Sequence, residues 1–320
     1  MPELPEVETI KLGLQKKIIG LKITKIQINS PKSFMGNPNL AQGQKVLNIW
    51  RKAKYLGVEL GSSLRDHEVA KQSIKKIATV RQEVGPRNDG VVLLFHLKMS
   101  GQLVWKGVSV KGEGERFIGG HPTPDMRDEM PNSHTRVIFS FADGSHLYFN
   151  DQRRFGWIRV ATSTEVTSNK LFEKLGPEPL EKDFTWEVLK NNLLKHKSMS
   201  IKVALMDQTV VSGVGNIYSN EACFDAKIDP RTKVGDLEDK EFKAIHEGVI
   251  RSIKEGIKHG GSSRAHFVDP EGKKGYFLDY AKVYMKNGRP CPRCKTDIKK
   301  IQLGGRGTYL CPKCQVGYNN

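Results

Sequence analysis

The sequence contains no run of about 18 apolar residues, the length that a membrane-spanning helix needs, so no transmembrane segment is predicted. Its N-terminus also lacks the basic stretch followed by an apolar stretch that marks a secretory signal. These two absences predict a protein of the cytoplasm.

Acidic residues are scarce relative to basic ones. The 320 residues include 35 Asp and Glu against 52 Lys and Arg, which gives a net charge of +17 and a pI near 9.6. Such an excess predicts a polyanionic partner, with nucleic acid as the first candidate and an anionic membrane surface as the second. The length predicts about two domains and is sufficient for a sizeable core.

Cysteine is also scarce, and its placement is uneven. Four of the five cysteines lie in the last 30 residues as two CxxC pairs, Cys291 with Cys294 and Cys311 with Cys314. A reducing compartment disfavours disulfides, and two such pairs 16 residues apart are typical of a zinc site. Four thiolate ligands leave no open coordination position, which predicts one structural Zn2+. The remaining Cys223 is interpreted as a small apolar core residue.

Three segments of the chain differ in their apolar patterns. Residues 1–163 are strand-rich after an initial helix, residues 164–288 show helical apolar spacing, and residues 289–320 form the cysteine-rich tail. Strands are predicted at 22–28, 44–50, 56–60, 91–97, 136–141 and 145–149, with a tight hairpin at 142–144. Helices of the second segment are predicted at 187–194, 202–205, 217–224 and 242–257. Two polar stretches, 61–90 and 106–132, are predicted to be long loops or insertions.

The residues after Met1 combine a helix start with a reactive amine. Met1 is readily removed before a small residue, which would leave Pro2 with a free secondary amine. Pro5 suits a first helical position, and carboxylates in the first turn favour the positive end of the helix dipole. An apolar stripe at helical spacing follows, formed by Val7, Ile10, Leu14 and Ile18. An ordinary Met-Pro start shares these features, so the rest of the chain decides between the two interpretations.

Two glycine-bearing turns are candidate phosphate sites. Asn216, after Gly213 and Gly215, is a plausible N-cap of an apolar helix, and helix N-termini bind phosphate through free N–H groups. Arg306 projects from the glycine-rich turn 304–308 between the CxxC pairs, and a guanidinium binds phosphate bidentately. The alternatives are ordinary helix capping for the first turn and a solvated hairpin tip for the second.

Seven motifs occur in one order along the chain, and together they resemble the bacterial formamidopyrimidine-DNA glycosylase family over nearly the whole length. They are PELPEVE at 2–8, RKAKYL at 51–56, HLKMSG at 96–101, DQRRFG at 151–156, LGPEPL at 175–180, GVGN at 213–216 and the CxxC pairs around GGRGT at 304–308. The resemblance implies an α+β fold. It consists of an N-terminal β-sandwich with a leading α-helix over 1–163, a helix–two-turns–helix domain over 164–288 and a C-terminal zinc-finger β-hairpin over 289–320.

The resemblance also implies roles for single residues. Pro2 is implied as the nucleophile that attacks C1′ of the damaged nucleotide, and Glu3 as its proton-transfer partner. Lys54 is implied to contact a phosphate near the lesion and to assist proton transfer, and Arg306 to bind the flanking phosphate and support the elimination. The residues implied to fill the gap left by the extruded base are Met99, Arg153 and Phe155. The implied contacts to the DNA backbone are His134, Arg153, Lys197 and Asn216.

The implied activity is that of a DNA repair glycosylase and AP lyase that excises oxidised purines, 8-oxoguanine and formamidopyrimidines, from double-stranded DNA. An amine that displaces the base leaves an iminium, which acidifies the C2′ protons and permits β- and δ-elimination. The nucleotide must first be extruded from the duplex. Core packing is the alternative interpretation for Met99 and Phe155. A monomer associated with the bacterial nucleoid is expected.

Two rival functions remain. An endonuclease VIII-type glycosylase would prefer oxidised pyrimidines, but Leu4 stands where that branch typically has glycine. The segment 260–277 also resembles the loop that closes over 8-oxoguanine, although its middle, 265–270, diverges. A zinc-ribbon DNA-binding protein without catalysis would need the tail and the positive charge but not the N-terminal residues. Gln152 departs from the family pattern, which usually has proline there.

Overall fold

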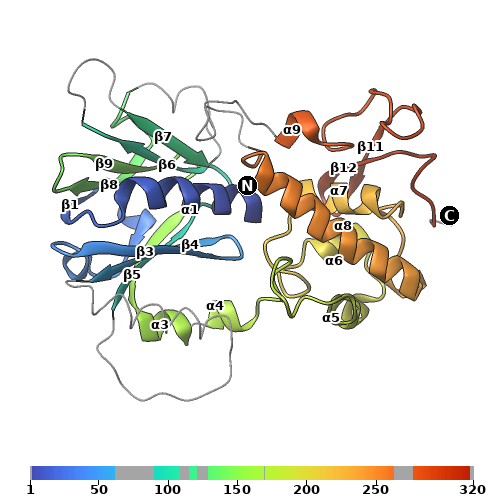
Figure 1. The fold of residues 1–320 in the computed structure, drawn as a ribbon, viewed down its shortest axis with the longest axis horizontal. Helices are drawn as coiled ribbons and strands as arrows, with labels where there is room; N and C mark the ends of the chain where they lie inside the picture. Colours follow the sequence, from blue (N-terminus) through green and yellow to red (C-terminus); the bar gives the residue numbers. More distant parts are fainter. Residues whose placement is uncertain are drawn as a thin grey trace. The chain divides into compact units, whose positions relative to one another are not determined.

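The computed structural model describes residues 2–61, 90–108, 115–120, 129–168, 170–262 and 277–317. The predictions for most of 61–90, for parts of 106–132 and for 263–276 fall outside these residues. The chain divides into two units. The first contains Pro2 and Glu6–Glu173, and the second contains Glu3–Pro5, Lys174–Ser262 and the described residues from 277 onward (Figure 1).

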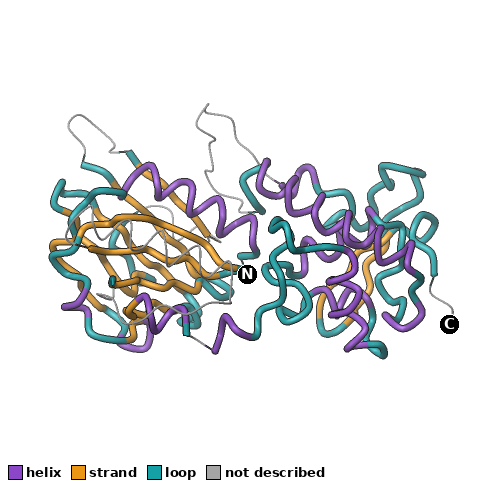
Figure 2. The backbone as a smooth tube through the Cα atoms, turned by 60° about the horizontal axis from the view of Figure 1, so that its bottom comes forward, coloured by secondary structure: helices purple, strands orange, loops and turns teal. Residues whose placement is uncertain are grey.

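The first unit is a β-sandwich of two five-stranded sheets (Figure 2). One sheet consists, in spatial order, of β1 (Ile23–Ile28), β8 (Thr135–Phe141), β9 (His146–Asp151), β6 (Gly101–Lys106) and β7 (Arg116–Gly120). The other consists of β2 (Phe34–Met35), β10 (Trp157–Thr162), β5 (Val91–His96), β4 (Tyr55–Gly61) and β3 (Lys45–Lys52). Neighbouring strands are antiparallel except β2 and β10, which run parallel.

The six predicted strands are confirmed, each with ends within two residues of the prediction. The hairpin between β8 and β9 is also confirmed, with Gly144 at a φ of +83°. Strands β2, β6, β7 and β10 were not predicted. The interpretation of 106–132 as a loop was wrong at β7, because packing decides its structure. A Cβ atom on Gly13 would lie 2.2 Å from the Phe117 ring, so the absence of a side chain at Gly13 makes room for this strand.

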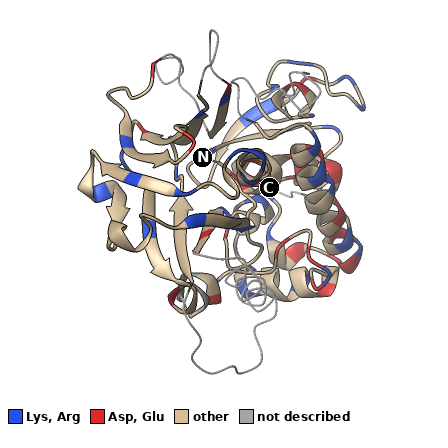
Figure 3. Cartoon of the chain, turned by 60° about the vertical axis from the view of Figure 1, so that its left-hand side comes forward, with Lys and Arg blue, Asp and Glu red and all other residues tan. Residues whose placement is uncertain are grey.

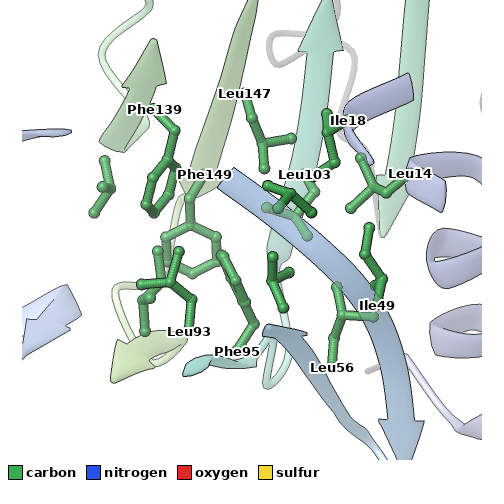
Figure 4. Packing of buried hydrophobic residues seen from close by; sticks show 14 of the residues in the cluster. Leu14, Ile18, Ile49, Leu56, Leu93, Phe95, Leu103, Phe139, Leu147 and Phe149 are labelled. Atoms are coloured by element: carbon green, nitrogen blue, oxygen red, sulfur yellow. The ribbon is translucent and has the colours of Figure 1, made fainter. Parts of the chain in front are cut away.

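Helix α1 (Leu4–Ile18) packs its apolar stripe into the sandwich, as predicted. Figure 4 shows Leu14 and Ile18 beside Leu103 and Ile49, which come from the two different sheets. Burying each aliphatic side chain stabilises the fold by about 1.5–3 kcal/mol. Because the helix starts at Leu4, Pro5 is its second residue rather than its first.

Two short helices cover the outer face of the second sheet. These are α3 (Ser163–Thr167) and α4 (Lys170–Glu173), seen below the strands in Figure 1. Helix α3 starts with a capping box, in which Thr162 and Glu165 each accept a hydrogen bond from the other's backbone N–H. A cluster that includes Trp50, Leu94 and Val166 lies beneath them.

The second unit is helical, with a β-hairpin near its end. Its helices are α5 (Trp186–Leu193), α6 (Ile201–Leu205), α7 (Asn216–Asp225), α8 (Asp239–Lys258) and α9 (Phe277–Tyr280), and its hairpin consists of β11 (Lys299–Leu303) and β12 (Arg306–Leu310). The four predicted helices are confirmed. Helices α7 and α8 approach closely at Gly248, where a Cβ atom would lie 2.7 Å from the Ala222 carbonyl oxygen. Among the described residues, no helix is long and apolar enough to cross a membrane.

Candidate active site

Glu3 lies at the start of α7, within the second unit. Pro2 and Glu3 are both buried, and Glu3 retains only 2% of its exposed surface. The Glu3 carboxylate accepts hydrogen bonds from the backbone N–H groups of Ile217 at 2.8 Å and Tyr218 at 3.4 Å. Both donors belong to the first turn of a helix, whose positive dipole end stabilises an anion. The structure therefore holds an acidic group next in the chain to Pro2.

The glycines of the GVGN turn make room for this contact. A Cβ atom on Gly215 would lie 2.5 Å from Cδ of Glu3, and one on Gly213 would lie 2.7 Å from Cβ of Leu4. Gly213 also has a φ of +85°, and its carbonyl oxygen accepts a 3.0 Å hydrogen bond from the Leu4 N–H. The prediction of Asn216 as N-cap was wrong. Gly215 occupies that position because any side chain there would collide with Glu3.

Asn216 instead connects a buried lysine to the zinc-finger hairpin. Its Oδ1 accepts a 2.5 Å hydrogen bond from Lys202 Nζ, and its Nδ2 donates a 3.2 Å hydrogen bond to the Gly307 carbonyl oxygen. Lys202 has no exposed surface. Burial lowers the pKa of Lys202, and the charge of Arg306 also lowers it, while Cys223 and Glu3 raise it. The net result is a pKa of about 8 instead of 10.5. A lysine with this pKa can exchange a proton near neutral pH.

Lys202 is a candidate functional residue that was missed from the sequence. It was assigned only to a helix, because its neighbours Ile201, Val203 and Ala204 are apolar. The signal that could have found it is a lysine flanked on both sides by apolar residues in a predicted helix. A lysine buried in such a place needs a polar partner or a shifted pKa. Cys223, by contrast, is fully buried, as expected of a core residue.

Arg306 begins strand β12, directly after the turn formed by Gly304 and Gly305. Both glycines have positive φ, at +57° and +70°, and the Arg306 side chain is exposed. Tyr309, further along β12, donates its backbone N–H to Asn220 Oδ1 of α7 at 2.7 Å. The hairpin is thereby fixed to the same helix that holds Glu3.

The four tail cysteines form a metal centre. Their Sγ atoms all lie within 4.8 Å of one another, including 3.4 Å between Cys294 and Cys311 and 3.9 Å between Cys291 and Cys314. The backbone N–H groups of Arg293 and Cys314 donate to Sγ of Cys291 and Cys311, each at 3.4 Å. Four sulfur ligands suit one tetrahedral Zn2+ and leave no position for a substrate, so the zinc is structural.

Lys54 lies in the first unit, in the turn between β3 and β4. Its side chain is buried, and the preceding Ala53 has a φ of +51°. Arg51 supports the turn, because its guanidinium donates to the Ala53 carbonyl oxygen at 3.2 Å and to the Glu8 carboxylate of α1 at 2.8 Å. Burial raises the pKa of Glu8, but hydrogen bonds and charges from Lys11 and Arg51 outweigh it, so the net pKa is lowered. This ion pair ties the Lys54 turn to α1.

The three predicted gap-filling residues lie on two turns of the first unit. Met99 follows β5, and Arg153 and Phe155 lie between β9 and β10. Phe155 is 54% exposed, with the Arg153 guanidinium 4.9 Å from its ring centre, so core packing is excluded for Phe155. Met99 is half-buried.

The remaining predicted DNA contacts are divided between the units. His134 precedes β8 in the first unit and is half-buried. Lys197 is exposed in the second unit, after the short 3-10 helix Leu194–His196, and its carbonyl oxygen accepts a 2.9 Å hydrogen bond from Gly235. Lys and Arg occur on strands, helices and loops alike rather than in one run of the sequence (Figure 3). The structure therefore groups Lys54, Met99, His134, Arg153 and Phe155 in the first unit, and Glu3, Asn216 and Arg306 around α7 in the second.

Three family models match the chain. Residues 1–158 match the formamidopyrimidine-DNA glycosylase N-terminal domain, residues 175–267 match its H2TH domain, and residues 288–316 match a zinc finger found in FPG and IleRS. A formamidopyrimidine-DNA glycosylase of Pelotomaculum thermopropionicum is 34% identical over 321 residues, covering 98% of this chain and 99% of the relative.

Solved structures of the Lactococcus lactis protein are also similar. A mutant in complex with DNA containing Fapy-dG has a TM-score of 0.77 at 30% identity. The wild-type protein with DNA containing an oxidised pyrimidine has a TM-score of 0.76 at 31% identity. Each comparison covers 98% of this chain and 99% of the other. With a leading helix, a β-sandwich, a helical unit and a four-cysteine hairpin in the same order, this chain belongs to the formamidopyrimidine-DNA glycosylase family.

Proposed function

We propose that this protein is a bifunctional DNA glycosylase and AP lyase of base excision repair that excises oxidised purines, 8-oxoguanine and formamidopyrimidines, from double-stranded DNA. The observation that carries the proposal is the buried Glu3 carboxylate, held by two backbone N–H groups of α7 directly after Pro2. Burying a carboxylate is costly unless it is hydrogen-bonded. A buried carboxylate directly after an amine is therefore better explained by a catalytic role than by a purely structural one.

In the proposed reaction, the Pro2 amine attacks C1′ of the damaged nucleotide and loses its proton, and the bond from C1′ to the base breaks with proton transfer to the leaving base. The C1′–O4′ bond of the sugar ring then breaks with proton transfer to O4′, which leaves an iminium between Pro2 and C1′. The resulting iminium loses a C2′ proton, and β- and δ-elimination cleave the strand on both sides. Glu3 accepts or returns protons at this centre and stabilises the cationic intermediate. Lys54 and Arg306 bind the phosphates around the lesion. Lys202, which is hydrogen-bonded to Asn216, carries protons.

DNA binding in this proposal depends on the positive net charge and on the two turns that carry Met99 and Phe155. The nucleotide must leave the stack, and apolar wedges offset the cost of unstacking. Phe155 and Met99 serve as wedges, and Arg153 faces the orphaned base. His134, Lys197 and Asn216 contact the backbone. The domains 1–163, 164–288 and 289–320 divide this work, and a monomer suffices for one lesion. We place the protein at the bacterial chromosome in the cytoplasm, in accord with its bacterial relatives.

Oxidised pyrimidines form a second candidate substrate class, because the Lactococcus lactis relative was solved with DNA that contains one. Leu4 bears on the choice between the branches. It is fully buried in the core of the second unit and packs against Gly213, so it helps to hold the N-terminal residues in place.

Borohydride trapping tests the proposal. Duplexes carrying 8-oxoguanine or thymine glycol should yield a covalent adduct with the protein, faster with 8-oxoguanine, and the adduct should map to Pro2. Pro2→Gly should reduce trapping strongly, whereas the matched change Pro31→Gly at an exposed position should not. Copies that retain Met1 should bind DNA without forming the adduct.

The opposite results distinguish the alternatives. A faster reaction with thymine glycol would assign the protein to the oxidised-pyrimidine branch. Binding to both duplexes without any adduct would leave a zinc-ribbon DNA-binding protein and refute the enzyme. Binding to undamaged DNA should weaken steeply with salt, because phosphate contacts release counterions.

A further inference from the structure

Asp151, the last residue of β9, is a buried carboxylate to which the proposed reaction gives no role. It has no exposed surface. Its Oδ1 accepts hydrogen bonds from Ser100 Oγ at 2.5 Å and from the Arg153 backbone N–H at 3.2 Å, and its Oδ2 accepts one from the Gly156 N–H at 2.6 Å. One carboxylate thus organises three donors from two separate turns.

Both turns carry proposed wedge residues. Ser100 directly follows Met99, and Arg153 and Gly156 enclose Phe155. Ser100 Oγ also accepts a hydrogen bond from the Arg153 N–H at 3.1 Å, which closes the connection between the turns. The strands behind them are paired directly, with Gly101 opposite Asp151.

The main chain of Asp151 extends this network to a third segment. Its N–H donates to the His134 carbonyl oxygen at 2.9 Å. Its own carbonyl oxygen accepts from Arg136 Nε at 2.8 Å, and Arg136 also donates to the Ser133 carbonyl oxygen at 3.1 Å. The segment that carries His134 is therefore held by the same residue as the wedge turns.

The turns need such support because their backbones are not favoured locally. Lys98 and Arg154 both have φ in the left-handed region, at +51° and +57°, which non-glycine residues rarely adopt. Gly156 fits closely under the carboxylate, since a Cβ atom there would lie 2.9 Å from the Phe149 ring and 3.1 Å from Asp151 Oδ2. Gln152 lacks the ring that would fix its φ if proline stood there. The Lys98 N–H donates to His96 Nδ1 at 3.0 Å within its own turn, whereas the residues on either side of Arg154 and Phe155 donate to Asp151.

We propose that Asp151 is a positioning residue that fixes Met99, Arg153 and Phe155 as one preformed wedge. This inference rests on the proposed function, because it assumes that these side chains enter the duplex. Asp151 itself touches neither DNA nor the reacting atoms. Because Asp151 holds the three side chains in place beforehand, no ordering of the two turns is needed when they enter the base stack.

The test compares Asp151→Asn with Asp143→Asn, the same change at the exposed hairpin between β8 and β9. An amide has one acceptor oxygen, so the change at Asp151 leaves at least one of the three donors facing an NH2 group. Ser100→Ala is the milder variant, since it removes only the connection to the Met99 turn. Three measurements are made on each protein: excision of 8-oxoguanine from duplex in a single turnover, borohydride trapping on a preformed abasic site, and the fluorescence of 2-aminopurine placed beside the lesion.

Misplacement of the wedge should slow excision and the rise in 2-aminopurine fluorescence by about 10- to 100-fold in Asp151→Asn, with a smaller loss in the same direction in Ser100→Ala. Trapping on the abasic site, where no base must be extruded, should stay within about threefold of the parent protein. Asp143→Asn should match the parent in all three.

Unchanged excision and fluorescence in both Asp151→Asn and Ser100→Ala would overturn the inference. So would a loss of abasic-site trapping equal to the loss of excision in Ser100→Ala, since that points to general damage of the site. Failure of the proposed function is a separate outcome, because the parent protein would then form no adduct at all.

Discussion

The role of the hydrogen bonds that hold the Glu3 carboxylate can be tested by adding a single methyl group at Gly215. In Gly215→Ala, the new Cβ atom would lie 2.5 Å from Cδ and 2.7 Å from Oε1 of Glu3, well inside van der Waals contact. The backbone can accept alanine, because Gly215 has a φ of −142° and ψ of −152°, in the extended region. The effect therefore comes from contact rather than from backbone strain. The carboxylate must move away from the N–H groups of Ile217 and Tyr218.

The magnitude follows from the two hydrogen bonds at stake. A hydrogen bond to a charged group contributes about 1.5–3 kcal/mol, and each 1.36 kcal/mol in a barrier changes a rate about tenfold. Loss of the stronger contact, at 2.8 Å, should slow adduct formation about 10- to 100-fold if Glu3 acts at the reacting centre. The fold should survive, because the helix and its core are otherwise unchanged.

The assay is single-turnover borohydride trapping on a preformed abasic duplex, with thermal unfolding measured in parallel. Gly90→Ala is the matched control, because its nearest neighbour would be the rotatable Ser163 hydroxyl at 3.3 Å. In a Glu3→Gln background, Gly215→Ala should have little further effect, since both changes act on the same group. The reasoning is refuted if Gly215→Ala reacts at the parent rate, or if it adds its full loss to Glu3→Gln.

Three further predictions concern stability and the metal. Leu14→Ala should lower the free energy of unfolding by about 2–5 kcal/mol in urea titration, because Leu14 is fully buried, whereas Leu12→Ala, at a position 44% exposed, should change it little; equal effects would contradict the assigned helix face. The pKa of Lys202 is about 8 in the folded protein against 10.5 ordinarily, so between pH 8 and 10.5 the unfolded state binds more protons than the folded state. The free energy of unfolding should therefore rise from pH 8 toward 10.5, and Lys202→Met should flatten this rise in urea titrations over the same pH range. Chelation of zinc, or Cys311→Ser, should abolish high-affinity DNA binding in a salt-titrated binding assay while the sandwich stays folded, because the hairpin that carries Arg306 depends on a cluster of few buried side chains; unchanged binding without zinc would refute this.

Local apolar patterns predicted α1 and most of the strands of the sandwich. The helical stripe of α1 and the runs of β-branched and apolar residues in β3, β4 and β8 were sufficient, because these side chains pack into a single core. Strand β7 could not be found in this way. Its sequence, RFIGG, has little alternation. Its position depends on the space beside Gly13, more than 100 residues earlier, which the Phe117 ring fills. Such long-range complementarity leaves no local pattern.

The GVGN turn shows the same limit at the candidate site, because its residues were predictable as a glycine turn but their purpose was not. The start of α7 offers free N–H groups, and a phosphate was the expected ligand in a protein of net charge +17. The structure fills two of these donors from within, with a carboxylate that lies more than 210 residues earlier in the chain. The charge of Glu3 is also one of the influences that raise the pKa of Lys202 against the effect of burial. The glycine at 215 is therefore a consequence of the acid beside Pro2, and its own neighbours in the sequence do not explain it.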